Sequence, residues 1–74
     1  MASKLKASPF RIGQTVRAIG DAFAGNEYKA GEIGIVDALK DGGLIIARMG
    51  GPRIKARTGA DLVCDPQNWE EVQS

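Results

Sequence analysis

The fold is decided by the stretch Gly31-Glu32-Ile33-Gly34-Ile35-Val36-Asp37-Ala38, which is followed by the turn Asp41-Gly42-Gly43 and the run Leu44-Ile45-Ile46-Ala47-Arg48-Met49. Two apolar runs joined by a tight Asp-Gly-Gly turn are typical of a β-hairpin. Neither run has a clean polar face, so we expect both strands to be largely buried or bent across two packed sheets.

Shorter patterns before the hairpin indicate a first strand and its entry segment. Phe10 and Ile12 are expected to tuck against the core, and Gly13 is expected to turn the chain. Residues 14–19 then alternate, which predicts Val16 and Ala18 on one face and Thr15 and Arg17 on the other. The residues before Pro9 are small, polar and basic, so we expect a flexible arm over 1–8 and a single domain over 9–74.

Patterns after the hairpin predict two further strands and a short turn. Residues 53–57 have strict period two, with Ile54 and Ala56 expected on the buried face. Asp65-Pro66-Gln67-Asn68 combines an N-cap acid with proline at the first helical position, which predicts one 3₁₀ turn. Residues 69–72 then end the pattern as a short closing strand.

The connection over residues 20–31 is long for so small a domain, and loops of this length are often functional. It is punctuated by glycines and carries two aromatic residues, Phe23 and Tyr28. Each ring has two interpretations: it anchors the loop to the core, or it faces a partner. We favour anchoring for each ring taken alone.

The order of these parts resembles the SH3-like small β-barrels. Gly13-Gln14-Thr15-Val16-Arg17-Ala18-Ile19 is similar to their G-x-x-V-R-V opening, and Gly31-Glu32-Ile33-Gly34-Ile35-Val36 to their second strand. The pattern is shared by KOW-type translation and transcription modules, by the small photosystem subunit of the PsaE type, and by small bacterial and phage proteins. The resemblance implies an all-β barrel of about five strands with a long loop between strands 1 and 2.

The amino-acid composition limits which catalytic and metal sites the chain can form. The chain has 74 residues, one cysteine (Cys64) and no histidine, so it lacks the usual general base and a zinc ligand set. No catalytic or cofactor motif is present, so we expect no metal, no cofactor and no enzymatic activity. Cys64 lies in an apolar run and is expected to be a small buried hydrophobe. The longest apolar run has four residues and no signal-peptide pattern opens the chain, so we expect a cytoplasmic protein that does not span a membrane.

Charge is unevenly placed along the chain. Residues 1–57 hold all ten Lys and Arg with five acids, whereas residues 58–74 hold four acids and no base. The cations that stand out are Arg48, Arg53, Lys55 and Arg57. They fit three interpretations: a solvated or edge-protecting face, which we favour, a nucleic-acid contact, or a contact with an acidic protein surface.

The C-terminal Trp69 is expected to cover one end of the barrel, with a binding-surface role as the alternative. Together these features predict a non-catalytic binding module, a small accessory protein that docks on a larger protein and modulates or stabilises it. The expected partner-binding residues are Phe23, Tyr28, Arg48, Arg53, Lys55, Arg57 and Trp69. The alternative is a KOW-like nucleic-acid-binding protein that uses the basic strand face. We expect a monomer or a weak homodimer.

Overall fold

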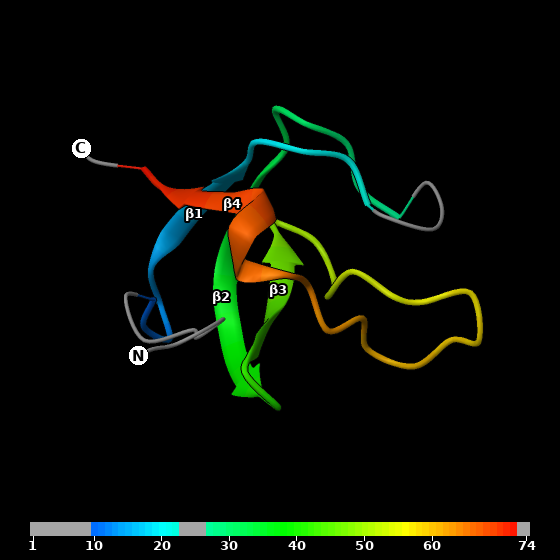
Figure 1. The fold of residues 1–74 in the computed structure, drawn as a ribbon. Coiled ribbons are helices and arrows are strands. Elements are labelled where there is room, and N and C mark those ends of the chain that lie inside the picture. Colours follow the sequence, from blue (N-terminus) through cyan, green and yellow to red (C-terminus); the bar gives the residue numbers. More distant parts are fainter. Residues whose placement is uncertain (1–9, 23–26, 73–74) are drawn as a thin grey trace.

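The computed structural model describes residues 10–22 and 27–72, which form one antiparallel sheet with a short 3₁₀ turn (Figure 1). The predicted arm over 1–8 and Phe23 lie outside these residues. The described residues contain no α-helix, and therefore no helix long and apolar enough to cross a membrane. In chain order the elements are β1 (Thr15–Ala18), β2 (Ile33–Lys40), β3 (Gly43–Arg48), η1 (Pro66–Asn68) and β4 (Trp69–Glu71).

The predicted hairpin is confirmed as β2 and β3. Lys40 pairs with Gly43, so the turn itself has only two residues, Asp41 and Gly42. Both have positive φ, 52° and 80°, as a tight hairpin turn of matching twist requires. Gly43, expected in the turn, is the first residue of β3.

A β-bulge bends β2 in its middle. Val36 pairs with Ile46 and Ala38 with Ile45, so Asp37 is an extra residue on its strand. The expectation that both hairpin strands are largely buried is wrong for β2, whose burial alternates along its length. It holds for β3, where the first four residues are buried. The difference arises because β2 covers the core with one face only.

The sheet order is β3-β2-β1-β4, so the chain returns at its C-terminal end to pair with its first strand. The alternation predicted for β1 is confirmed: Val16 and Ala18 are buried, whereas Arg17 is exposed. In the entry segment Phe10 is buried as expected, but Ile12 is 65% exposed. The expected turn at Gly13 is confirmed, since its φ is 93° and Gln14 donates its N–H to the Arg11 carbonyl at 3.1 Å.

The strand predicted over residues 53–57 does not form as one continuous element. Ile54 donates its N–H to the Ile46 carbonyl at 2.8 Å, so the chain first follows the free edge of β3. It then folds back on itself, because Ala56 donates to Ala60 and Leu62 donates to Ile54. Only isolated bridges result, and the named strands make an open sheet of four. We call residues 53–62 the 53–62 arm; it extends from the body of the molecule (Figure 1).

The core lies on the inner face of the sheet. Val16, Val36, Leu44, Ile46 and Ile54 are each at most 1% exposed. Among the described residues no charged or polar residue is buried with them. The 3₁₀ turn and β4 form where expected, with the Asp65 carboxylate accepting the Gln67 N–H at 2.9 Å as the N-cap.

Candidate functional site

The basic side chains predicted as a row are largely engaged with carboxylates. Arg53 Nε lies 2.5 Å from an Asp37 carboxylate oxygen, and its Nη1 lies 2.6 Å from Asp61. Lys55 Nζ lies 2.6 Å from the other Asp61 oxygen. Hydrogen bonds from Lys55 and then Arg53 lower the pKa of Asp61. These contacts join the bulge of β2 to the 53–62 arm, so the two cations are tied to acids of their own fold.

Arg48 connects β3 to the long loop. Its Nε lies 3.1 Å from a Glu32 carboxylate oxygen, and its Nη2 donates to the backbone carbonyl of Glu27. A guanidinium can hold both acceptors at once because its donors are arranged as a rigid fork. Arg48 thereby fixes where the loop rejoins β2.

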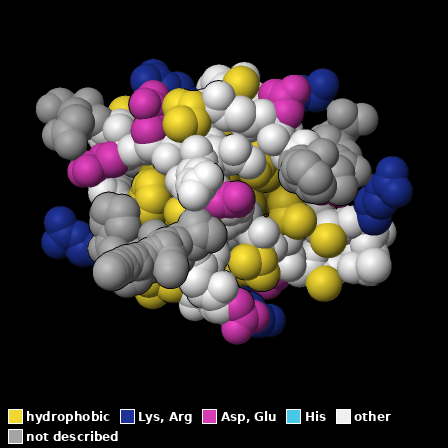
Figure 2. All heavy atoms as spheres, in the orientation of Figure 1, with side chains coloured by type: hydrophobic (Ala, Val, Ile, Leu, Met, Phe, Trp, Pro, Cys, Tyr) yellow, Lys and Arg dark blue, Asp and Glu magenta, His cyan; other side chains and the backbone are white. Residues whose placement is uncertain are grey.

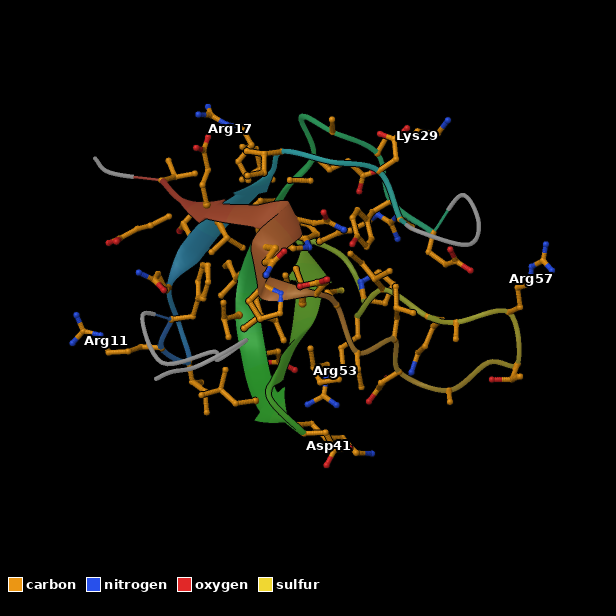
Figure 3. The ribbon with its side chains drawn as sticks, viewed as in Figure 1. Arg11, Arg17, Lys29, Asp41, Arg53 and Arg57 are labelled. Carbon is orange, nitrogen blue, oxygen red and sulfur yellow. The ribbon has the colours of Figure 1, made fainter. Side chains whose placement is uncertain are left out.

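Arg57 is the exception among the predicted cations. It is exposed near the tip of the 53–62 arm and points away from the body of the molecule (Figure 3). It forms no ion pair within residues 10–22 and 27–72. Arg11, Arg17 and Lys29 project on other sides of the molecule (Figure 3), so the described cations are dispersed around it.

The two described aromatic candidates pack together in the core. Tyr28 and Trp69 are 2% and 3% exposed, and their ring centroids are 4.9 Å apart at 52°. Such a tilted pair is a favourable aromatic arrangement. Asn68 Nδ2 donates to the Tyr28 hydroxyl at 3.0 Å, and burial raises the pKa of Tyr28. Tyr28 therefore anchors the loop to the C-terminal elements, and Trp69 covers the core beside it.

Hydrogen bonds hold the described ends of the long loop close together. Asp21 accepts the Ala30 N–H on its side chain at 2.8 Å, and Ala22 donates its N–H to the Tyr28 carbonyl at 3.0 Å. Gly31 donates to the Ala18 carbonyl where the loop meets the sheet. With Tyr28 buried, these contacts hold residues 20–22 and 27–31 beside residues that come much later in the chain.

A pocket of about 190 Å³ lies between this loop and the C-terminal segment. The loop contributes Ala22, Glu27 and Tyr28, and the other wall consists of residues 62–65 with Asn68. Most of the lining is apolar. Figure 2 shows hydrophobic side chains beside Asp and Glu side chains on the face that carries η1. The volume suits one side chain of a partner better than a cofactor.

The described lining of the pocket holds two acidic residues and no lysine or arginine. Its two carboxylates, Glu27 and Asp65, come from opposite walls. Neither forms an ion pair within the described part of the chain. The Asp65 carboxylate caps η1, and Cys64 lies between it and Val63 in the wall. The site is therefore an apolar pocket with an acidic rim.

The ionisable groups buried at the pocket do not exchange protons near neutral pH. Burial raises the pKa of the Cys64 thiol to about 12, so the nucleophilic thiolate is scarce at neutral pH. The expectation that Cys64 is a small buried hydrophobe is confirmed, since it is 1% exposed. Across residues 10–22 and 27–72 no group of three His, Cys, Asp or Glu side chains converges as a metal site would require.

Sequence reasoning singled out Tyr28 but did not find the opposite wall of the pocket. Leu62, Val63 and Asp65 lie more than thirty residues away in the sequence, and only the fold brings them to Tyr28. The one local signal was the apolar run that ends at Asp65-Pro66, which predicts a turn and gives no indication of a pocket. Comparison of the chain with protein-family models, with curated proteins and with solved structures gives no match.

Proposed function

We propose that this protein is a non-catalytic binding module, a small cytoplasmic accessory protein that docks on a larger protein through the pocket between its long loop and residues 62–65. The observation that carries the proposal is that contacts within the protein itself hold the described pocket walls in place. Tyr28 is buried and Arg48 binds the loop backbone, so the loop wall is already in place. A preorganised site avoids the cost of ordering a loop when the partner binds.

We further propose that the fold is a variant of the SH3-like barrel. Residues 52–54 and Cys64 bond to the edge of β3, and Leu44 and Cys64 exchange both backbone hydrogen bonds, at 2.9 and 2.7 Å. From Cys64 the chain passes through η1 to β4, which pairs with β1. The chain thus travels from one edge of the open sheet to the other, as closure of a small barrel requires.

The ion pairs weigh against the nucleic-acid alternative. Phosphate binding needs cations that are free to replace counterions. Arg48, Arg53 and Lys55 already face carboxylates, and the exposed Arg57 stands apart at the tip of its arm. Of the four cations predicted for this contact, only Arg57 forms no ion pair within the described residues, and a contact through Arg57 alone gives weak binding that salt removes.

Affinity capture from an extract of the source cells tests the proposal, with Val63→Arg as the variant. Val63 lines the pocket but is 41% exposed, so a long polar side chain can be accommodated there and blocks the site. Met49→Arg is the matched control, because Met49 is 56% exposed and does not line the pocket.

We expect wild type and Met49→Arg to retain one polypeptide after nuclease treatment, and Val63→Arg to lose it while melting near the wild-type temperature. Capture that disappears on nuclease treatment would support nucleic acid instead. Capture that survives Val63→Arg would show that the pocket is not the docking site.

A further inference from the structure

We infer that the occupant of the pocket is the side chain of a lysine or arginine in a basic segment of the partner polypeptide. This inference rests on the proposed function and names the chemistry of the partner. It is carried by the combination of an apolar interior with two carboxylates, Glu27 and Asp65, that form no ion pair with any other described residue.

The interior suits the carbon chain of a long side chain. Ala22, Leu62 and Val63 offer apolar surface from both walls, and Tyr28 also lines the pocket. Lysine and arginine side chains bury their methylene groups against such surface while the charged end stays at the rim. A volume of about 190 Å³ accommodates one such chain.

The rim suits a cation. The pocket lining holds two carboxylates from segments far apart in the chain, the half-buried Glu27 on the loop and the exposed Asp65 before η1. The Asp65 carboxylate accepts one backbone N–H, and the Glu27 carboxylate makes no hydrogen bond within the described residues. Both therefore keep acceptor capacity for an ammonium or guanidinium group, and hydrogen bonds between charged partners are the stronger kind.

The same features disfavour other side chains. An acidic side chain in the pocket would meet two carboxylates at close range. An uncharged aliphatic side chain would fill the interior but would remove water from Glu27 and Asp65 without providing a partner. Of the cations near Glu27, Lys55 binds Asp61 and Arg48 binds Glu32, whereas Arg57 lines a second hollow with Glu27 and forms no ion pair within the described residues.

Titration of the full chain with capped pentapeptides tests the inference. The probes are Gly-Gly-Xaa-Gly-Gly with arginine, lysine, citrulline or glutamate at the centre; citrulline has the shape of arginine without its charge. Amide NMR shifts of Ala22, Leu62 and Val63 report on the pocket walls. Trp69, the single tryptophan, gives a fluorescence signal because its ring lies 4.9 Å from that of Tyr28.

We expect saturable binding of the arginine or lysine peptide at millimolar concentrations, and binding of the citrulline peptide that is weaker by about tenfold. Glu27→Gln and Asp65→Asn should each lower the affinity for the cationic peptide by about three- to tenfold. Asparagine caps a helical turn as well as aspartate does, so Asp65→Asn keeps η1 intact. Glu71→Gln is the control, because Glu71 is exposed and does not line the pocket.

Three results would overturn the inference: equal binding of the citrulline and arginine peptides, no saturable shift with any cationic peptide, or no effect of the two rim variants. Its failure can be distinguished from failure of the proposed function. If no peptide binds while Val63→Arg still abolishes capture, the partner docks at the pocket but does not insert a lysine or arginine side chain. If the arginine peptide binds while Val63→Arg leaves capture intact, the pocket does bind a cationic side chain, but the partner docks elsewhere on the protein.

Discussion

Replacing Gly34 by alanine tests how closely β2 and β3 must approach in the middle of the sheet. Gly34 pairs with Val16 on one side and with Arg48 on the other. A Cβ atom there would lie 2.5 Å from Ile46 Cγ2 and 2.7 Å from the Ala47 carbonyl oxygen. A side chain can rotate away from such a contact, but a backbone carbonyl within a strand cannot. The variant therefore forces the two strands apart.

Overpacking of this kind costs about 1–3 kcal/mol in the free energy of unfolding. In a domain of this size each kcal/mol lowers the melting temperature by about 4–8 °C, so we expect a loss of roughly 5–20 °C. Thermal and urea unfolding followed by Trp69 fluorescence and circular dichroism measure it. Gly51→Ala is the control, since the nearest atom to a Cβ at Gly51 is Arg48 Cβ at 3.6 Å. We expect that variant to stay within about 0.5 kcal/mol of wild type. A Gly34→Ala protein as stable as wild type would refute this account of the strand contact.

Three further outcomes follow from the contacts of single side chains. The pKa of Asp61 is lowered in the fold, mainly by Lys55, so its stabilising effect is present above the unfolded pKa of about 3.9 and is lost as pH falls through the folded value. Asp61→Asn should be less stable than wild type at pH 7. Urea titrations at several pH values should show the unfolding free energies of the two proteins converging below about pH 4. Cys64, with a pKa of about 12, should resist a thiol reagent at pH 7 until the protein unfolds; because that pKa is raised by folding, stability should fall as pH rises above about 9. Rapid labelling of the native protein would contradict its burial. Tyr28→Phe removes the acceptor of the Asn68 amide and should cost about 1 kcal/mol, measured by urea unfolding; no loss would show that this hydrogen bond contributes no net stability.

The features that the sequence predicted correctly depend on residues close together in the chain. Asp41 and Gly42 make a two-residue turn because both accept positive φ, and the apolar runs on each side then pair. Asp65 and Pro66 begin a 3₁₀ turn, because the Asp65 side chain accepts the N–H of Gln67, only two residues further along the chain. The alternation around Val16 assigns the buried face of β1, since neighbouring strand residues point to opposite sides.

The tertiary structure alone decided which charges meet and where a pocket opens. The predicted row of cations over residues 53–57 does not form, because Arg57 lies in a turn at the tip of the 53–62 arm and Arg53 binds Asp37 across the bulge of β2, which no local pattern indicated. The pocket likewise requires the loop that carries Tyr28 to face residues 62–65. Both arrangements depend on strand register and on a bulge, which are set by packing between distant segments. Turn chemistry and periodicity act over a few residues, so they specified the strands, and long-range packing specified the surface that the strands present.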